Sequence, residues 1–437
     1  MRFLLLLALL ALAAGTAESA LAQPAPAVSA SAEAIYKSAK PRLLQIRTLV
    51  NSASQKSSTG SGFLVSASGL AITNYHVVSQ HAMEPQTYRM EYVSADGSHG
   101  DVKLLAFDVV NDLALIQLDK GGWQFFEFDA RALADNLPRG EKLFSLGNPL
   151  DIGFAVMEGN YSGLVERSYN ERIHLSGPMN PGMSGGPTLS STSRIAGINV
   201  AKIAMGAEQV SFLVPAKFAA ALLKKTHLPE PITAAASRAE IGRQLVAWQV
   251  GLYDAIEGKG FQTAALGPYT VPESAAGWFT CWARTNADAK PKPRAQADQS
   301  SCDTQIWHFI SGELRVGDIE ISHAYYSSLD LNAFQFSTFV AAGSANHYAG
   351  GSVKRMTAPA CHEDFVKLPG DEHPPLRVQW CAVAYRDFAG LYNIDVSAIT
   401  QDRSLQMLTS RIEMNGVSYE NAVRLAQRFL ADIKVKP

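Results

Sequence analysis

The feature that most limits the fold is a succession of short apolar segments, separated by turn residues, between Pro41 and about Thr226. Short apolar runs bounded by glycine, proline, asparagine, aspartate and serine are typical of antiparallel strands. Asp96-Gly97 stands at the turn of one expected hairpin, and the stretch "SGFLVSASGLAITNYHVV" is expected to form a strand, a turn and a second strand. The pattern predicts a mainly β region that is closed by a helix beginning near Pro215.

The second half of the chain has a different texture. Apolar residues recur at helical spacing and predict a helix from about Ser237 to Glu257. Strand-like and helical segments follow, and an amphipathic helix is expected over Ser418–Ile433. The polar, proline-containing segment Asn286–Ser301 is expected to be an exposed loop. We therefore predict an α+β domain at residues 237–437.

Length and charge set broader limits. A chain of 437 residues is too long for one ordinary core and suggests two or three domains. We expect residues 32–226 to form the β domain and residues 227–236 to form a linker. The net charge is −2, so nothing in the overall charge points to nucleic acid as a partner.

The N-terminus resembles an export signal. Met1-Arg2 precedes an apolar run over Phe3–Ala14, and "ALA" follows at Ala20–Ala22. A charged start, an apolar middle and a small-residue cleavage site are typical of a signal peptide, whereas a membrane anchor needs about 20 apolar residues. We predict a signal peptide at residues 1–22, a flexible segment at residues 23–31, and a periplasmic or secreted protein without a stable membrane span after signal removal.

The four cysteines fit that compartment. All of them lie in the second half, at Cys281, Cys302, Cys361 and Cys381. Four cysteines allow three pairings, and we prefer the local one, Cys281 with Cys302 and Cys361 with Cys381. Each such bond closes a loop and stabilises the fold by about 3 kcal/mol in the chain-entropy model. Because no CxxC pair is present, a metal site is the less favoured interpretation, and no cofactor is expected.

The stretch "NPGMSGGPTLS", Asn180–Ser190, places one serine among small residues. A nucleophilic serine needs a base that takes its proton and donors that hold the oxyanion. Main-chain N–H groups serve as donors only where the backbone turns tightly, which Gly182 permits. Gly185 and Gly186 leave room behind Ser184. The stretch is therefore a candidate nucleophile loop, although a simple glycine-rich turn would look the same.

Two further elements give this candidate a context. His76 lies in "AITNYHVVS", and Asp112 opens the apolar strand "DLALIQLD". Alone, each has a structural interpretation, as a packed histidine and a turn-forming aspartate. With Ser184 they stand in the order His, Asp, Ser, which is the chymotrypsin-like order among serine hydrolases.

At this point the sequence resembles the trypsin-like serine peptidases, in particular the bacterial Deg/HtrA-type branch. The matching pieces are "GSGFLVSASGLAITNYHVV", "NDLALIQLD", "SLGNPL" and "NPGMSGGP", in the correct order from Gly60 to Pro187. The resemblance implies a mainly β fold of two six-stranded antiparallel β-barrels. From the residues themselves, a separate disulfide-containing α+β domain is expected to follow. It also implies a serine endopeptidase, with His76 as the base, Asp112 orienting it and Ser184 as the nucleophile.

The resemblance also implies an oxyanion hole and a substrate pocket. The N–H groups of Gly182 and Ser184 would form the oxyanion hole, and Pro178 and Met179 would lie at a modest apolar pocket. The family usually carries Asp or Asn before the nucleophile, whereas this chain has Met183. Its apolar side chain lacks that polar contact, but its main-chain N–H is expected to remain available.

The C-terminal domain has no family resemblance that we identify, and it does not look like the peptide-binding PDZ domain that usually follows in Deg-type proteins. We expect protein or peptide substrates, and an envelope partner could bind through this domain. Two alternatives stay open. The chain could be a catalytically weak or inactive peptidase-fold protein that binds peptides or partners, or an esterase that uses the same residues.

Overall fold

The computed structural model describes residues 30–200, 210–225, 227–228, 230, 232–312, 314–343, 354–367, 375–400 and 405–436. The predicted signal peptide at residues 1–22 lies outside the described residues, and so does most of the segment predicted as flexible. Helix α1 (Ala30–Ala39) begins within the last residues of that segment. Over the described ranges, no helix has both the length and the apolar character needed to cross a bilayer.

Six antiparallel strands form the first barrel, in the order β1-β2-β3-β6-β5-β4. They are β1 (Leu43–Val50), β2 (Lys56–Leu64), β3 (Leu70–Thr73), β4 (Tyr88–Ser94), β5 (His99–Asp108) and β6 (Leu113–Leu118). Gly97 lies at the β4–β5 turn with a φ of 88°, as expected for the Asp96-Gly97 hairpin. Apolar side chains such as Phe63 and Ile116 are fully buried inside.

A second closed barrel follows, in the order β10-β11-β12-β9-β8-β7. Its strands are β7 (Lys142–Gly147), β8 (Ala155–Leu164), β9 (Ile173–Ser176), β10 (Pro187–Leu189), β11 (Ile195–Val200) and β12 (Val210–Pro215). The short helix α3 (Ala130–Leu133) connects the barrels, and α4 (Ala216–Leu222) follows β12 directly, as the sequence predicted. The predicted mainly β fold with two six-stranded antiparallel barrels is confirmed.

The prediction that "AITNYHVV" continues as a strand is wrong. Strand β3 ends at Thr73, and helix α2 (Tyr75–Met83) begins two residues later. Asn74 keeps an extended backbone with a ψ of 150°, which is the usual conformation of a residue before a helix. Tyr75, Val78 and Ala82 are all fully buried and recur at helical spacing. This burial outweighs the strand preference of the adjacent valines, so His76 lies in the first turn of a helix.

The C-terminal part is built around a seven-stranded antiparallel sheet in the order β15-β16-β19-β23-β22-β21-β20. Its strands are β15 (Thr280–Thr285), β16 (Ala295–Asp303), β19 (Ile319–Ser328), β20 (Ala360–Val366), β21 (Leu376–Ala384), β22 (Leu391–Ile399) and β23 (Gln406–Ser418). Two small sheets join β13 (Thr263–Leu266), β14 (Tyr269–Pro272) and β24 (Lys434–Val435), and β17 (His308–Ser311) with β18 (Leu314–Val316).

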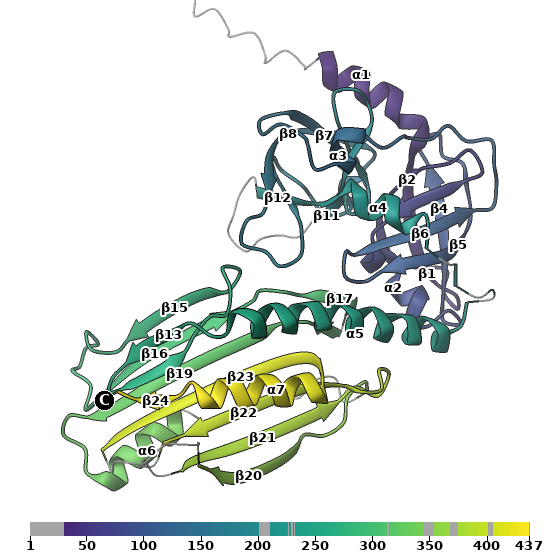
Figure 1. Ribbon diagram of the computed structural model, residues 1–437. Helices are drawn as coiled ribbons and strands as arrows, with labels where there is room; N and C mark the ends of the chain where they lie inside the picture. The colour runs from purple at the N-terminus through teal and green to yellow at the C-terminus, as the bar shows by residue number, and fades with distance from the viewer. Residues whose placement is uncertain are drawn as a thin grey trace, which may run out of the picture.

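Three helices accompany this sheet: α5 (Ala234–Lys259), α6 (Ala333–Gly343) and α7 (Tyr419–Ala431). Helix α7 packs one face of the sheet through Ala422, Leu425 and Phe429, all of which are fully buried. In Figure 1 the long helix α5 runs along the boundary between the barrels above and the sheet below. The hydroxyl of Thr233 caps it by accepting a hydrogen bond from the N–H of Ala236 at 3.1 Å, so the helix begins inside the segment predicted as a linker.

The prediction of an exposed loop over Asn286–Ser301 is wrong for its second part. Strand β16 begins at Ala295 and pairs with β19 along its whole length, from Ala295 opposite Ser328 to Asp303 opposite Glu320. Ala295 is fully buried. Because the neighbouring residues of this strand are mostly polar, the apolar alternation that marks a strand is absent from the sequence.

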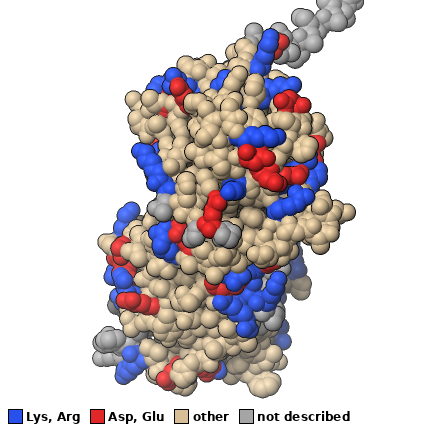
Figure 2. Space-filling model, turned by 90° about the vertical axis from the view of Figure 1, so that its right-hand side faces the viewer, with Lys and Arg blue, Asp and Glu red and all other residues tan. Residues whose placement is uncertain are grey.

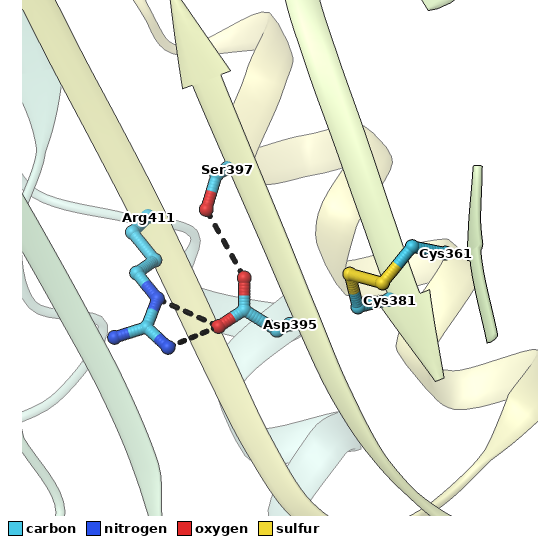
Figure 3. The surroundings of a disulfide bond; sticks show 5 residues. All are labelled: Cys361, Cys381, Asp395, Ser397 and Arg411. Atoms are coloured by element: carbon cyan, nitrogen blue, oxygen red, sulfur yellow. Dashed lines mark hydrogen bonds and ion pairs between the residues drawn. A yellow bond between two sulfur atoms is a disulfide. The ribbon is translucent and has the colours of Figure 1, made fainter. Parts of the chain in front are cut away.

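Two disulfides staple opposite edges of the seven-stranded sheet. Cys281–Cys302 joins β15 to β16, and Cys361–Cys381 joins β20 to β21. This is the local pairing preferred from the sequence. Figure 3 shows the second disulfide near an ion pair on β22 and β23, in which the Arg411 guanidinium contacts the carboxylate of Asp395.

Candidate active site

His76 and Asp112 are 36 residues apart in the chain and meet directly. Nδ1 of the His76 ring lies 2.7 Å from Oδ2 of Asp112. The other carboxylate oxygen, Oδ1, accepts the main-chain N–H of His76 at 2.9 Å. The side chain of Asp112 is 10% exposed and that of His76 is 29% exposed. The carboxylate therefore binds both the ring and the main chain of His76, and these two contacts fix the orientation of the imidazole.

The backbone around Asp112 is held as firmly as its side chain. Its φ is 60°, in the left-handed region that aspartate tolerates better than most residues. Its carbonyl oxygen accepts hydrogen bonds from Nδ2 of Asn74 at 2.7 Å and from the N–H of Tyr75 at 3.2 Å. The two residues that precede His76 thus bind the same turn that presents the carboxylate.

Ser184 lies in the tight turn between β9 and β10, and it is 5% exposed. The turn contains two glycines with positive φ, Gly182 at 94° and Gly185 at 84°. A Cβ atom at Gly182 would lie 2.5 Å from the carbonyl oxygen of Asn148. A Cβ atom at Gly185 would lie 2.8 Å from the main-chain nitrogen of Asn74. Both positions therefore require glycine, for conformation and for space.

Met183 is fully buried in this turn. Its main-chain N–H was expected to remain available, but it donates to the carbonyl oxygen of Asn180 at 3.1 Å, so that expectation is wrong. The carbonyl oxygen of Met183 accepts the N–H of Gly186 at 3.0 Å and Nδ2 of Asn199 at 3.3 Å. Hydrogen bonds to the backbone of Met183 thus hold the turn where the family usually places a polar side chain.

Ser61, on β2, connects this turn to the first barrel, and nothing in the sequence marked its role. Its N–H donates to the carbonyl oxygen of Ser184 at 2.8 Å, and its hydroxyl donates to that of Gly182 at 2.7 Å. The hydroxyl also accepts the N–H of Asn148 at 2.8 Å. The carbonyl oxygen of Ser61 accepts the hydroxyl of Thr73 at 2.7 Å. A continuous set of bonds therefore runs from the Ser184 turn to the end of the strand that leads to His76.

Arg172 also went unnoticed in the sequence. It stands just before β9 in the second barrel, and its guanidinium donates to the carbonyl oxygen of Val110 at 3.2 Å and to Oδ1 of Asn111 at 3.5 Å. Burial lowers the pKa of Arg172 from its ordinary value, while the negative charges of Asp112 and Asp108 act in the opposite direction. A single arginine just before a strand carries no sequence signal for this bridge between the barrels.

The residues predicted at a substrate pocket lie after β9. Pro178 is exposed, and Met179 is half-buried against the core of the second barrel. The hydroxyl of Ser211, on β12, donates to the carbonyl oxygen of Gly177 at 2.7 Å. These contacts place the segment beside β12, and the substrate pocket itself stays a prediction.

Charged side chains of both signs lie close together on the face shown in Figure 2, and neither sign covers that face as a whole. This face is therefore unlike the single-sign surfaces that attract polyanions.

Comparison with known proteins agrees with this geometry. Residues 60–198 match the family described as Trypsin-like peptidase domain. This part of the chain is similar to trypsin-like peptidase domains. The match spans His76, Asp112 and Ser184, and it ends before the C-terminal sheet begins.

Curated relatives of the peptidase domain carry Deg-type names. "Protease Do-like 1, chloroplastic" of Arabidopsis thaliana is 31% identical over 151 residues, which are 33% of this chain and 33% of the relative. A "Probable periplasmic serine endoprotease DegP-like" of Rhizobium meliloti is 29% identical over 166 residues, covering 37% of this chain and 31% of the relative. A solved serine endoprotease from Yersinia pestis is 21% identical and covers 45% of this chain and 66% of that chain, with a TM-score of 0.39. The chain spans about a third of the length of the curated relatives it matches.

Proposed function

We propose that this chain is an exported serine endopeptidase that hydrolyses peptide bonds through Ser184, His76 and Asp112. The observation that carries the proposal is the 2.7 Å contact between His76 Nδ1 and Asp112 Oδ2. The bonds from Ser61 to the Ser184 turn support it, because they attach the proposed nucleophile to the strand system that leads to the histidine. The match to a trypsin-like peptidase domain points to the same chemistry.

In the acylation step, Oγ of Ser184 attacks the carbonyl carbon of the scissile peptide bond, and Nε2 of His76 takes the hydroxyl proton. The carbonyl π electrons move to the oxygen and form a tetrahedral oxyanion. As this intermediate collapses, the C–N bond breaks and His76 gives its proton to the leaving amine. Asp112 holds the imidazole in the required tautomer and stabilises the imidazolium that forms between these two transfers.

Deacylation follows the same chemical steps, with water as the nucleophile. His76 takes a proton from water, which attacks the acyl carbon, and then returns the proton to Oγ of Ser184 as the ester bond breaks. The products are a free carboxylic acid and the regenerated hydroxyl. No cofactor is needed, because each proton passes through one imidazole.

The N–H groups of Gly182 and Ser184 are the proposed oxyanion donors. The N–H of Gly182 donates to no acceptor in the described part of the chain. The peptide units that contain these two N–H groups are held through their carbonyl oxygens: that of Pro181 accepts the N–H of Leu150 at 2.9 Å, and that of Met183 accepts the N–H of Gly186 at 3.0 Å. Removing one such donor in related chemistry typically costs about 3 kcal/mol of transition-state stabilisation.

Export is part of the proposal. Residues 1–22 have the pattern of a signal peptide, and two disulfides are typical of proteins from oxidising compartments. Relatives named as periplasmic endoproteases support the same location. We therefore propose a periplasmic or secreted enzyme with protein or peptide substrates.

The test compares the full-length mature protein with its Ser184→Ala variant. A fluorophosphonate probe should label the native protein at Ser184, as shown by mass spectrometry of the labelled peptide, and the variant should remain unlabelled. Cleavage of a proteome-derived peptide mixture should depend on Ser184 in the same way. Peptides that bind without either reaction would favour the peptide-binding alternative, and ester hydrolysis without peptide cleavage would favour an esterase.

A further inference from the structure

Helix α2 carries His76, and the C-terminal domain binds both of its ends. At the start, the hydroxyl of Tyr75 donates to the carbonyl oxygen of Ile310, on β17, at 3.1 Å, and both residues are fully buried. Burial raises the pKa of Tyr75 above its ordinary value, so the hydroxyl remains a donor. At the other end, Glu84 accepts a hydrogen bond from Arg355 at 2.8 Å. The helix therefore cannot shift without moving against the C-terminal domain.

The hairpin formed by β17 and β18 also contacts the imidazole ring of His76. The ring of Phe309, the residue before Ile310, packs edge-on against the imidazole of His76, with centroids 6.0 Å apart and an interplanar angle of 73°. The ring is half-buried. Since the Nδ1 edge of the imidazole is bonded to Asp112, contact with Phe309 restricts rotation about the remaining side-chain torsions.

The turn that carries Asp112 is held by a second element of the C-terminal domain, helix α5. Oε1 of Gln244 accepts the N–H of Val109 at 2.8 Å, and its Nε2 donates to the carbonyl oxygen of Phe107 at 2.8 Å. Gln244 is 6% exposed. One amide thus binds both main-chain groups at the end of β5, three residues before Asp112.

These polar contacts lie within a shared apolar core. Val78, Ala82 and Met83 of α2 form one cluster of buried side chains with residues of the C-terminal domain. The contributors from that domain include Ile241, Leu245, Ile310, Val316, Met356 and Phe388. Figure 1 shows α2 above α5 and near β17, at the boundary between the two parts. Without the C-terminal domain, the outer face of α2 would be exposed apolar surface.

We infer that the C-terminal domain is the support that holds the His76–Asp112 pair in register, with Gln244 and Phe309 as positioning residues. This inference rests on the proposed function. It assigns to the domain a role in the chemical step, because the domain binds the segment of each partner and contacts the imidazole itself. The peptidase domain is consequently not a self-sufficient catalytic unit.

The first test uses a matched pair of variants in the full chain, Gln244→Leu and Gln249→Leu. Gln249 lies on the same helix and is 1% exposed, but its amide accepts hydrogen bonds from Ser418 and Asn421 within the C-terminal domain. We expect Gln244→Leu to lower kcat for a peptide substrate and the fluorophosphonate labelling rate at least tenfold, with KM changed less than threefold. Gln249→Leu should lower thermal stability without that loss. Equal labelling rates in the two folded variants would overturn the inference.

A spectroscopic readout separates this inference from the proposed function. A proton shared between Nδ1 of His76 and Asp112 gives a low-field proton resonance that does not require turnover. We expect Gln244→Leu to shift or broaden it and Gln249→Leu to leave it intact. If the wild-type protein failed to label, the proposed function would fall, whereas the response of this resonance would still decide whether Gln244 positions the pair.

The second test concerns Phe309. Phe309→Ala should slow labelling by a small probe about tenfold, and Phe309→Leu should recover most of the rate because it restores apolar bulk beside the imidazole. A faster reaction of Phe309→Ala than of the wild type would contradict positioning, since it would mean that the hairpin obstructs the site. An unchanged labelling rate with altered peptide preference would also contradict it.

Discussion

The two carboxylate oxygens of Asp112 bind two different groups of His76, the ring Nδ1 at 2.7 Å and the main-chain N–H at 2.9 Å. We expect Asp112→Asn to preserve this spacing but to present an amide N–H to one of those groups, which favours the wrong imidazole tautomer. The turnover number for peptide hydrolysis should fall by about 10⁴-fold, with KM little changed. The measurement is steady-state kinetics alongside circular dichroism of the folded variant.

Asp108→Asn is the control for this prediction. Asp108 lies in the same turn, and its carboxylate accepts the N–H of Asn111 at 3.0 Å and Nδ2 of the same residue at 3.1 Å. Its loss should disturb the turn but leave the carboxylate of Asp112 in place, so we expect less than a tenfold effect. If the two variants were equally impaired, the contact with the imidazole would not be the reason.

Ser61→Ala should weaken the proposed oxyanion hole by removing a hydrogen bond to the backbone that carries its donors. The substitution removes the hydroxyl that donates to Gly182 and leaves the N–H of Asn148 without its acceptor. A lost hydrogen bond with a buried partner left unpaired typically costs about 1–3 kcal/mol of stability. Because the Gly182–Met183 peptide unit, which lies between the two proposed donors, also becomes freer to rotate, the fluorophosphonate labelling rate should fall about tenfold or more.

The comparison for Ser61→Ala is Ser94→Ala. Ser94 is also buried, and its hydroxyl bonds to Asp96 and Ser98 in the β4–β5 turn. Because Asp96 and Ser98 are exposed and water can replace the lost bonds, this variant should lose less stability and keep the labelling rate. A normal rate in Ser61→Ala would show that the oxyanion donors do not depend on this serine.

Strands and turns were accessible from the sequence because their signals are local, whereas the two barrels and the three candidate catalytic residues were implied by the resemblance to trypsin-like peptidases. The hairpin at Asp96-Gly97 and the small-residue stretch around Ser184 are each readable within a few positions. The helix that carries His76 could not be predicted in this way, because the valines beside it favour a strand. Only the tertiary structure shows that Tyr75, Val78 and Ala82 are buried together on one face of a helix.

The contacts with the C-terminal domain were inaccessible for a different reason. Tyr75 and Ile310 are 235 residues apart. The acceptor is a main-chain carbonyl group, which every residue has, so the residue type at position 310 does not reveal the contact. Strand β16 was hidden because most of its residues are polar although it lies inside the sheet. Ser61 lies in a segment that was expected to form a strand and that carries part of the family resemblance, but no role was predicted for its hydroxyl.

The disulfides should matter most at the two edges of the seven-stranded sheet. The outer strand β15 is exposed along almost its whole length, so little buried area holds it to β16 beyond Cys281–Cys302. Replacing both cysteines by serine should lower the free energy of unfolding of the C-terminal domain by about 3 kcal/mol. Hydrogen exchange should show faster exchange of the β15 amides, while the peptidase barrels keep their protection. Unchanged exchange in β15 would contradict this role, and the Cys361/Cys381 double variant provides the same comparison at the other edge.

His323 should make the C-terminal domain sensitive to acid. It is 3% exposed, its ring contacts the hydroxyl of Ser410 and the carbonyl oxygen of Pro272, and burial lowers its pKa to about 4. An unfolded histidine titrates near pH 6.5. Between pH 6.5 and 4 the unfolded chain binds a proton that the folded chain rejects, so stability should fall as the pH falls through this window. The loss should approach about 3 kcal/mol.

His323→Gln should remove this dependence, and denaturant unfolding from pH 7 to pH 4 measures it as a difference between wild type and variant. Burial raises the pKa of Asp318 to about 6 and that of Glu413 to about 7, which makes each lose stability as the pH rises through the same region. Both groups are present in both proteins, so their effect cancels in the difference. The exposed His99 provides the control, because His99→Gln should leave the pH slope as in the wild type. A His323→Gln protein that lost stability in acid as steeply as the wild type would show that the buried imidazole is not the acid-sensitive group.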